Sequence, residues 1–382
     1  MPSFTATKPQ ALIARSAIQH VRLYMYRLPM QRPLHYTVKR MRVRHGFFIE
    51  LEDAEGRQGL GEVSYLPGFH PQTGYQIRQE LLMTLRMIQK GDINLSQRSG
   101  DMFPIHWKWK VPISPLIRFA LDQAFLHLLC QQHNTSMSDI WDRKPHLRVP
   151  TNALLNDLNE QAVFRCMTFR EEGYPAIKIK VGRRALRQEI RLLEDIRSAL
   201  GDKILLRLDA NRRWELETAI AFGKAIAPLN IEYIEEPLRN PRLVPQFYTA
   251  TGVPVALDES IGEAQDVENM LLPGVQAVIF KPEFFGEFSI TYRLIKRVEQ
   301  QGIRPILSCS FYTGYTLATL VQLASAWIKD PSPQGLSTFL YFKQDILQTP
   351  PIPRGGAFFL KEVIDSQYQV NRNELTLIRS GI

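Results

Sequence analysis

The sequence predicts an α/β fold in which a parallel barrel of strands and helices follows a smaller α+β domain. From Val149 onward, short strand-like runs recur about every 20–30 residues, with helical stretches between them. This alternation is the pattern of a (β/α) barrel. Before that point the chain has long alternating runs followed by helices, which is the pattern of a mixed α+β unit.

The first domain is predicted to span residues 1–135. Within it, residues 20–65 are expected to form strands, because HVRLYMYRLPM and GFFIELEDAEGRQGLGEVS carry alternation and many β-branched or aromatic residues. The segment Pro29–His35 between these runs is expected to be a loop. Helices are expected at 74–90 and 115–131.

The barrel is predicted to span residues 136–344, with the C-terminal segment 345–382 packing back on the first domain. Eight strands are expected to begin near residues 149, 175, 204, 231, 254, 277, 304 and 335. Helices are expected at 159–172, 184–200, 214–227, 263–271, 287–301 and 315–328. Some of the strand runs are almost continuously apolar, as strands that are covered on both faces should be.

The bulk composition indicates a folded protein without a nucleic-acid partner. The formal net charge is +9, but the basic residues are dispersed and no nucleic-acid-binding motif accompanies them. The densest basic cluster is Lys39, Arg40, Arg42 and Arg44. We interpret it as a solvated strand face, with a basic wall that attracts an anionic substrate as the alternative.

Cysteine usage and the N-terminus predict a cytoplasmic protein. Cys130, Cys166 and Cys309 are far apart and lack metal-ligand spacing, which fits a reducing compartment. The N-terminus lacks the apolar core of a secretory signal, and no apolar run is long enough to span a membrane. A targeting extension over roughly the first 15 residues is the alternative. Monomer and homo-oligomer are both left open.

Five strand-like runs of the barrel end in charged residues, which are Lys178 and Lys180, Asp209, Glu235, Asp258 and Lys281. The successive steps from Lys180 are 29, 26, 23 and 23 residues, each about one strand and its return helix. Because the carboxyl ends of the strands in a parallel barrel form one rim, these groups are expected to face one cavity.

The three acids predict a metal site at this rim. Oxygen atoms of Asp209, Glu235 and Asp258 on consecutive strands can converge on one hard divalent cation. Mg²⁺ takes oxygen ligands and leaves positions for substrate oxygens, and Mn²⁺ is the alternative. Three unrelated acids that begin surface loops would account for the residue types but not for their regular spacing.

The lysines predict proton transfer. Lys178 and Lys180 lie two residues apart in a strand, so their side chains point to the same face, and such a pair is poor core chemistry. Lys281 lies on the sixth strand, across the barrel from them. A lysine that is crowded by another cation and partly desolvated has a lowered pKa and can act as a base near neutral pH.

The motifs KIKVG, RLDANRRW, YIEEPL, ALDES and IFKP, in this order and spacing, resemble the enolase superfamily. Within it they are similar to the muconate-lactonizing subgroup, in which a KxK lysine and a second lysine act on opposite faces of the substrate. GLGEVSYLPGF and SPLIRFALDQAFLHLL resemble the capping-domain loop and long helix of that subgroup. The resemblance covers roughly residues 20–345. It implies a modified (β/α)8, or (β/α)7β, TIM-type barrel with an α+β capping domain.

The resemblance also implies roles for the residues that match its motifs. Asp209, Glu235 and Asp258 match the metal ligands, and Glu235 is preferred over Glu236 because the family uses the first Glu of EEP. Lys180, the second lysine of KxK, matches the general base and acid.

Two more lysines receive roles in the same way. Lys281 matches the opposite lysine, which stabilises the substrate anion from the far face. Lys178 would assist by its charge near the substrate carboxylate.

Six further residues are candidates for substrate binding, namely Arg207, Asn211, Ser308, Ser310, Gly314 and Phe69. Asn211 is expected to support the ligand shell, and Arg207 either pairs with an inward carboxylate or contacts substrate. The two serines and the helix start at Gly314 can hold a second substrate carboxylate, with simple helix caps as the alternative.

The loop YLPGFHPQTG supplies the last candidate. Phe69 is expected either to form a lid over the barrel mouth or to pack at a domain interface. His70 replaces a small polar residue of the family loop, and its role is left open.

The resemblance implies a Mg²⁺-dependent carbon–oxygen lyase with a small carboxylate substrate. Its LPGFHPQT, LSCSFYTG and GLSTFLYF segments are nearest to members that dehydrate 2-succinyl-6-hydroxy-2,4-cyclohexadiene-1-carboxylate through an enediolate, in menaquinone or phylloquinone synthesis. Racemisation of N-acylamino acids or epimerisation of dipeptides is the alternative, because the same lysines abstract the proton. A non-catalytic barrel scaffold is the third hypothesis.

Overall fold

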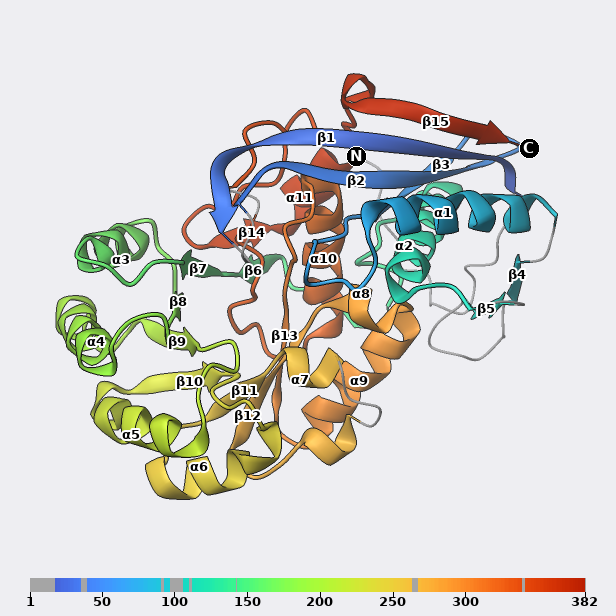
Figure 1. Cartoon of the computed structure of the whole chain (residues 1–382). Coiled ribbons are helices and arrows are strands. Elements are labelled where there is room, and N and C mark those ends of the chain that lie inside the picture. Colours follow the sequence, from blue (N-terminus) through green and yellow to red (C-terminus); the bar gives the residue numbers. More distant parts are fainter. Residues whose placement is uncertain are drawn as a thin grey trace.

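The computed structural model describes residues 18–35, 40–90, 93–96, 106–109, 112–141, 143–262, 267–338 and 341–381. A four-stranded antiparallel sheet lies beside a seven-stranded parallel sheet that curls into a barrel (Figure 1). Within these ranges, no helix combines the length and the apolar character that a membrane crossing needs.

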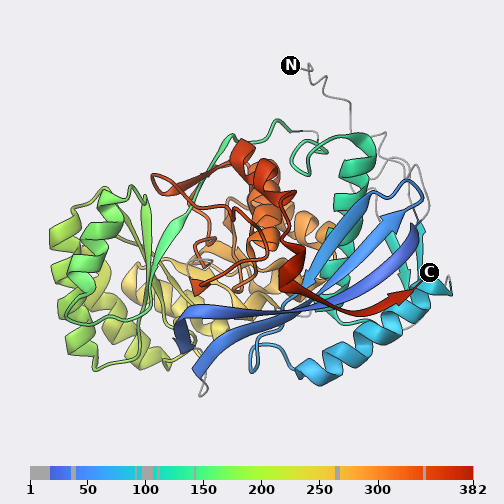
Figure 2. The ribbon, with the colours of Figure 1, turned by 90° about the horizontal axis from the view of Figure 1, so that it is seen from above.

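The antiparallel sheet joins the beginning and the end of the described chain. Its strands are β1 (Ile18–His35), β2 (Arg40–Asp53), β3 (Gln58–Val63) and β15 (Leu375–Gly381), in the order β15-β1-β2-β3. β1 pairs antiparallel with both β2 and β15. The C-terminal segment passes over the barrel to reach β1 (Figure 2). The domain limits 1–135 and 136–344 stay a prediction.

Two helices, α1 (Gly74–Gln89) and α2 (Pro115–His133), lie against this sheet and agree with the expected ranges. Apolar side chains of the sheet and of both helices share one core. The backbone of α2 approaches β3 so closely that a Cβ added to Gly61 would lie 1.7 Å from the carbonyl oxygen of Ala120. The short strands β4 (Ile93–Ser96) and β5 (His106–Trp109) pair with each other.

Pro29–His35 belongs to β1 and is not the expected loop. Pro29 pairs with Val43 and Leu34 pairs with Met41 of β2. The register shifts between Pro29 and Leu34, and an irregularity of this kind accommodates proline, which cannot donate a ladder hydrogen bond. Pairing with β2 therefore overrides the local turn signal.

The barrel strands are parallel and adjacent in chain order. They are β7 (Asn152–Leu155), β8 (Ala176–Lys180), β9 (Leu205–Asp209), β10 (Ile231–Glu235), β11 (Val255–Leu257), β12 (Val275–Phe280) and β13 (Arg304–Leu307). Gln334 and Gly335 bridge the two ends of this sheet, to Thr151 beside β7 and to Ser308 beside β13. The eighth strand expected near residue 335 is thus only two bridged residues, because the chain leaves the ladder in a turn at residues 337 and 338.

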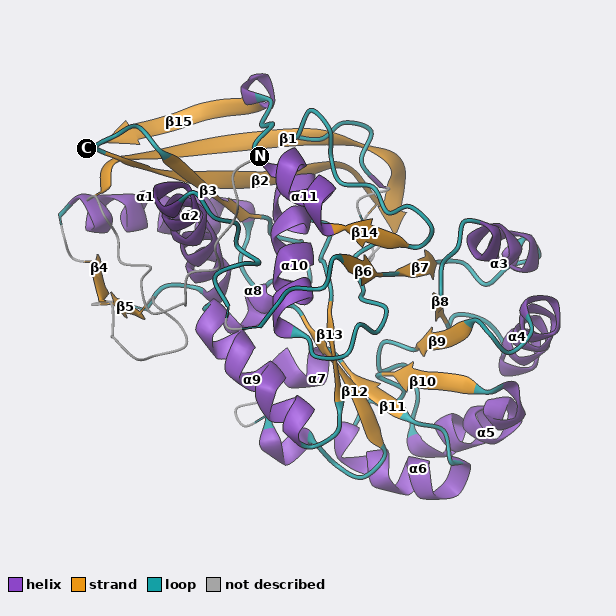
Figure 3. Cartoon of the chain, turned by 180° about the vertical axis from the view of Figure 1, so that it is seen from behind, coloured by secondary structure: helices purple, strands orange, loops and turns teal. Residues whose placement is uncertain are grey.

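Helices surround the barrel strands (Figure 3). They are α3 (Ala162–Glu171), α4 (Leu186–Leu200), α5 (Leu216–Ile226), α6 (Val244–Thr251), α7 (Glu259–Gly262), α8 (Pro282–Phe285), α9 (Phe288–Gln300) and α10 (Gly314–Trp327). β6 (Arg148–Pro150) pairs with β14 (Ala357–Phe359), which leads into α11 (Leu360–Gln367). Short 3-10 turns occupy Ala227–Leu229, Pro241–Leu243, Glu268–Met270 and Arg372–Glu374.

One expected helix differs from the structure, and some observed helices were not expected. Of the helix expected at 263–271, residues 263–266 lie outside the described ranges and 268–270 form a 3-10 turn. Helix α6 was not expected, although Pro245 in its first turn and Gly252 at its C-cap mark both of its ends.

Alternation along the barrel strands separates an inner layer from an outer one. Inward-facing residues such as Tyr233 and Ile279 form a small inner core. Their neighbours in sequence, such as Ile234 and Phe280, pack in the main core beneath the helices. The last inward position of each strand lies above the inner core, at the C-terminal rim.

The basic cluster on β2 is not a solvated face throughout. Lys39 and the side chain of Arg40 lie outside the described residues, but Arg44 is only 1% exposed. Its guanidinium donates to the carbonyl oxygens of Ser64 at 2.8 Å and Phe311 at 3.0 Å. Arg44 therefore ties the loop after β3 to the loop after β13 and does not face a substrate.

Replacing Gly61 with alanine tests the close packing of α2 on β3. The new Cβ would overlap a backbone oxygen, which cannot rotate away, and overpacking of this kind costs about 1–3 kcal/mol. We expect urea unfolding to show a free energy of unfolding reduced by about that amount. The control, Leu377→Ala at a position 52% exposed, should change it by less than about 0.5 kcal/mol. Equal stability of Gly61→Ala and the unmodified chain would contradict the packing.

Candidate active site

A cavity of about 330 Å³ opens at the C-terminal ends of the barrel strands. Its walls come from the ends of β7 to β13, from the loop after β3 and from residues 335–338. Parallel barrels place their active sites at this end. The six charged residues predicted for the rim all line the cavity, and they are Lys178, Lys180, Asp209, Glu235, Asp258 and Lys281.

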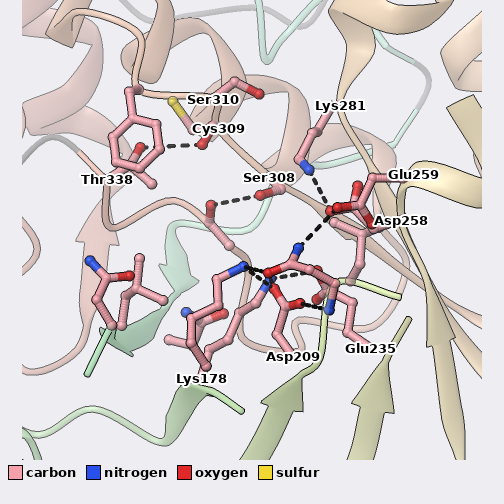
Figure 4. Close-up of a pocket in the computed structure, with 18 of the residues that line it drawn as sticks. Lys178, Asp209, Glu235, Asp258, Glu259, Lys281, Ser308, Cys309, Ser310 and Thr338 are labelled. Carbon is pink, nitrogen blue, oxygen red and sulfur yellow. Dashed lines mark hydrogen bonds and ion pairs between the residues drawn. The ribbon is translucent and has the colours of Figure 1, made fainter. Parts of the chain in front are cut away.

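Strand register places these side chains beside one another. Lys180 is opposite Asp209 across β8 and β9, and Asp209 is opposite Glu235 across β9 and β10. Lys178 Nζ lies 2.8 Å from Asp209 Oδ2 and 2.6 Å from Glu235 Oε1. Lys180 Nζ lies 2.5 Å from Asp209 Oδ2. Ion pairs thus join Asp209 and Glu235 to the two lysines of β8 in one network at the rim, where Lys178 lies beside both acids (Figure 4).

Burial raises the pKa of both Asp209 and Glu235, but the net shifts of the two acids have opposite directions. Burial alone would raise the pKa of Asp209, but the charges of Lys178 and Lys180 hold it well below its ordinary value. Burial, and then the charge of Asp209, raise the pKa of Glu235 well above its ordinary value, and Lys178 offsets only part of this. The Glu235 Oε2 atom is also buried without a hydrogen-bond partner. Glu235 therefore shares the Lys178 ammonium group through one oxygen and keeps the other oxygen without a partner.

The pKa of Lys281 is raised, whereas a lowered pKa was expected. Its ammonium group pairs with Asp258 Oδ2. Although burial lowers its pKa, the charges of Asp258 and Glu259 raise it above the ordinary value. Lys178 behaves in the same way, because burial is outweighed by the two acids that it contacts. In the protein by itself, neighbouring acids raise the pKa of Lys178 and Lys281 by more than burial and neighbouring cations lower it.

The three acids fit a magnesium site by their chemistry. In the described part of the chain, no three His, Cys, Asp or Glu side chains stand in a metal-binding arrangement, and the carboxylates bind lysine ammonium groups instead. The donor set offers three hard oxygen groups of the kind that Mg²⁺ prefers, and the unpartnered Glu235 Oε2 leaves one such oxygen available. Asp209, Glu235 and Asp258 stay the predicted ligands.

Glu236, the second acid of EEP, is already used by the protein. It accepts hydrogen bonds from the main-chain N–H groups of Asp258 and Ser260, at 2.8 Å each, and from the Ser260 hydroxyl at 2.7 Å. Glu235 lines the cavity and Glu236 does not. These contacts favour Glu235 as the ligand and let Glu236 hold the chain around Asp258 at the rim.

Asn211 links Lys180 to a further acid of the cavity. Its Oδ1 accepts from Lys180 Nζ at 2.9 Å, and its Nδ2 donates to Glu259 Oε1 at 3.0 Å. Its φ of 45° lies in the left-handed region, which asparagine tolerates. Burial raises the pKa of Glu259 to about 7. Asn211 thus joins Lys180 to Glu259, and its role in supporting the ligand shell stays a prediction.

Arg207 does not reach the cavity, which corrects its assignment as a candidate substrate contact. It lies two residues before Asp209 on the same face of β9, one layer deeper in the barrel. Its Nε pairs with Glu232 Oε2 at 2.6 Å, its Nη1 donates to the carbonyl oxygen of Pro333 at 2.7 Å, and its guanidinium lies 5.2 Å from the Tyr233 ring centre. Arg207 therefore stabilises the barrel interior below the site.

Gly314 does not line the cavity either, and the start of α10 is closed to a substrate anion. The Gly314 N–H donates to Asp345 Oδ2 at 2.8 Å. The Thr313 N–H and hydroxyl both donate to Glu62, the hydroxyl at 2.8 Å. Because two carboxylates of the chain already satisfy this helix N-terminus, the expected carboxylate site there is corrected.

The remaining substrate-binding candidates do line the cavity. Ser308 Oγ donates to the carbonyl oxygen of Gly335 at 3.3 Å, whereas Ser310 Oγ is buried without a partner. Phe69 reaches the cavity from the loop after β3, and its ring centre lies 4.9 Å from Lys281 Nζ. This position is consistent with a lid residue over Lys281.

His70 shapes the loop that carries Phe69. Its Nδ1 accepts from the Leu66 N–H at 2.9 Å, and its ring stacks on Phe284 with centres 5.6 Å apart. Burial lowers the pKa of His70 to about 4. His70 is therefore neutral at physiological pH and packs beside the site without adding charge.

Two basic residues of the cavity, Arg183 and Arg213, were not predicted. They follow β8 and β9, respectively, in the loops at the active-site end of the barrel. That position was the available signal, since loops at this end build the sites of parallel barrels. They were missed because neither arginine matches a functional position in the family motifs.

Magnesium should stabilise the folded chain through the three acids. A ligand that binds only the folded state raises its thermal midpoint, so Mg²⁺ added to EDTA-treated protein should raise Tm. Glu235→Gln should lose this shift, because the amide removes a charged ligand. Glu283→Gln alters a buried glutamate that does not line the cavity. This variant should keep the Mg²⁺-dependent rise in Tm. Equal shifts in the two variants would rule out Glu235 as a ligand.

Glu283 itself should make stability depend on pH. Both of its carboxylate oxygens are buried without a hydrogen-bond partner, and burial raises its pKa from 4.5 to about 7. Because the folded state then binds the proton more tightly, the free energy of unfolding should fall as pH rises from about 4.5 to about 7.

Urea unfolding of Glu283→Gln across this pH range measures that contribution. Above pH 7 the variant should be more stable than the unmodified chain by on the order of 2–3 kcal/mol, and the difference should vanish near pH 4. Parallel curves for the two proteins over the whole range would contradict the buried carboxylate.

Comparison with known proteins finds a family for each part of the chain. The family described as "Enolase C-terminal domain-like" matches residues 161–363, more than half of the chain. The family described as "MenC, N-terminal domain" matches residues 18–105. The resemblance that the motifs indicated is thereby confirmed.

Curated relatives and solved structures agree with this result. o-Succinylbenzoate synthase of Pectobacterium atrosepticum is 29% identical over 340 residues, which are 88% of this chain and 94% of that protein. Protein PHYLLO, chloroplastic, of Arabidopsis thaliana is 29% identical over 306 residues, 74% of this chain but only 18% of that protein. The structure of dipeptide epimerase from Cytophaga hutchinsonii, complexed with Mg and D-Ala-L-Val, aligns with a TM-score of 0.74 and 20% identity, over 89% of this chain and 92% of that one. The structural similarity confirms the predicted barrel with its capping domain.

Proposed function

Because the chain belongs to the enolase C-terminal domain-like family, we propose that it is an o-succinylbenzoate synthase. Such an enzyme removes water from 2-succinyl-6-hydroxy-2,4-cyclohexadiene-1-carboxylate to give 2-succinylbenzoate, for menaquinone or phylloquinone biosynthesis. The observation that carries the proposal is the placement of Lys180 on β8 and Lys281 after β12 around a cavity that also presents three carboxylates. Similarity to a synthase over 88% of the chain supports this choice of reaction.

Lys180 is the residue that moves the proton. In its neutral form, Nζ takes the proton from the carbon that bears the ring carboxylate, and the C–H electron pair passes into the conjugated ring. The resulting ammonium group then donates a proton to the departing hydroxyl, so that one C–H and one C–O bond break and one water leaves. The product ring is aromatic, and the first step is therefore the one that most needs stabilisation.

Lys281 and Lys178 provide positive charge around the anion. Although burial lowers the pKa of Lys281, Asp258 and Glu259 raise it above the ordinary value, which favours the ammonium form. A permanently charged ammonium group suits electrostatic stabilisation of a developing anion better than proton abstraction. The pKa of Lys178 is raised for the same reason, so it can hold the substrate carboxylate.

Asp209, Glu235 and Asp258 would hold Mg²⁺, which supplies Lewis-acid stabilisation of negative charge on a substrate carboxylate. The chain itself provides the frame for this set. Glu236 holds the backbone of Asp258 through two N–H groups, and Asn211 holds Lys180.

The Lys180→Ala variant tests the assignment of the base. Loss of a general acid–base group costs about 10²- to 10⁴-fold in rate, so turnover of the cyclohexadiene substrate should fall by at least that factor. The Mg²⁺-dependent rise in Tm should persist, because the three acids remain. Lys224→Ala removes an exposed lysine on α5 and should leave turnover unchanged. Near-normal turnover of Lys180→Ala would contradict the assignment.

The same pair of lysines on separate strands favours one alternative, racemisation of N-acylamino acids or epimerisation of dipeptides. Turnover measured in parallel on the cyclohexadiene substrate and on N-succinyl amino acids, with and without EDTA, separates the two reactions. A synthase should act on the first substrate by orders of magnitude faster.

The Lys281→Ala variant extends this comparison. In a racemase it should block α-proton exchange from one enantiomer only, because each lysine then serves one face of the substrate. That outcome, together with faster turnover of the amino acid, would overturn the synthase proposal.

A further inference from the structure

The cavity contains two kinds of positive charge. The lysines that line it are each paired with an acid at the rim. Arg183 and Arg213 also line it, and within the described ranges neither forms an ion pair with a carboxylate. The Arg183 guanidinium donates from Nη1 to the carbonyl oxygen of Asn156 at 3.1 Å, while the Arg183 main-chain N–H donates to Glu189 Oε1 at 2.8 Å. The arginines are therefore the cavity cations whose charge the protein has not compensated.

The two arginines lie close together in the fold. Arg183 is in the loop after β8 and Arg213 in the loop after the neighbouring strand β9. The Arg213 stem packs over Gly182, where an added Cβ would lie 3.2 Å from Arg213 Cδ and 3.3 Å from its Cβ. Gly182 has a φ of +74°, a left-handed backbone conformation that favours glycine. This contact places the Arg213 stem against the residue that precedes Arg183.

The opposite wall offers no comparable charge. Ser308 and Ser310 are neutral, and the N-terminus of α10 is satisfied by Glu62 and Asp345. A substrate with a second carboxylate, several carbons from the reacting one, would therefore find no cation on that wall. Arginine is suited to the task, because its planar fork binds a carboxylate through two parallel hydrogen bonds.

We propose that Arg183 and Arg213 form the binding site for the distal carboxylate of a dianionic substrate, the end of the succinyl arm. This inference rests on the proposed function and adds the residues that select a dicarboxylate. The reacting end lies among the lysines and acids of the rim, and the flexible arm extends toward the loops after β8 and β9. Both arginines act in substrate binding, so their loss should raise KM more than it lowers kcat.

Two probes that differ only in the distal carboxylate test the proposal directly. 2-Succinylbenzoate carries it, and 2-butanoylbenzoate replaces it with a methyl group. Calorimetric titration of the full chain with Mg²⁺ gives Kd for both. We expect Arg213→Ala to weaken 2-succinylbenzoate binding by about tenfold or more, as the loss of a charge-assisted hydrogen bond does, and to change 2-butanoylbenzoate binding less than twofold. Arg213→Lys should recover part of the loss.

Arg239→Ala is the matched control. Arg239 is an exposed arginine in the loop after β10, paired with Glu215 and outside the cavity, so its loss should change neither Kd. Equal weakening of both probes in Arg213→Ala and Arg183→Ala, or no weakening of either, would overturn the proposal. So would an unmodified chain that binds neither probe.

Turnover of the unmodified chain separates this inference from the proposed function. If the chain does not dehydrate the cyclohexadiene substrate but still distinguishes the two probes through Arg213, the reaction is overturned and the dicarboxylate site stands. If it dehydrates the substrate and the arginine variants retain its KM, the reaction stands and the site is overturned.

Discussion

Carboxylates buried at the ends of neighbouring strands need cations beside them, and the site is arranged around that need. Asp209 receives two lysines and is held ionised. Glu235 shares one of them and keeps an unpartnered oxygen. Taking such groups out of water without full compensation is costly. Additional positive charge at the rim would therefore stabilise these carboxylates, and a divalent cation among the three acids would supply it.

The capping sheet is held to the barrel by buried polar groups as well as by apolar packing. Glu62 on β3 accepts from the hydroxyls of Tyr26, at 2.6 Å, and Thr313, at 2.8 Å. Arg44 on β2 binds the carbonyl oxygen of Phe311. These contacts fix the loop after β3 over the barrel mouth, and that loop places Phe69 beside Lys281. The contact of Glu62 with Thr313 also satisfies part of the N-terminus of α10.

The strand ends could be predicted because parallel strands of a barrel share one rim, and a period of two gives the face of each residue. The depth of a residue within the barrel could not be predicted in this way. Arg207 shares a face with Asp209 but lies one layer lower. Gly314 is at a helix start, as expected, yet its carboxylate partner Asp345 is visible only in the fold. The pKa of Lys281 likewise depends on how many acids surround it.

Growth of crystals with Mn²⁺, followed by an anomalous difference map, is the most direct test of the central claim. The account predicts one strong peak per chain, coordinated by carboxylate oxygens of Asp209, Glu235 and Asp258, with the Lys178 ammonium displaced from between the first two. A peak elsewhere in the chain, or a manganese-saturated crystal in which Lys178 still bridges Asp209 and Glu235, would contradict it.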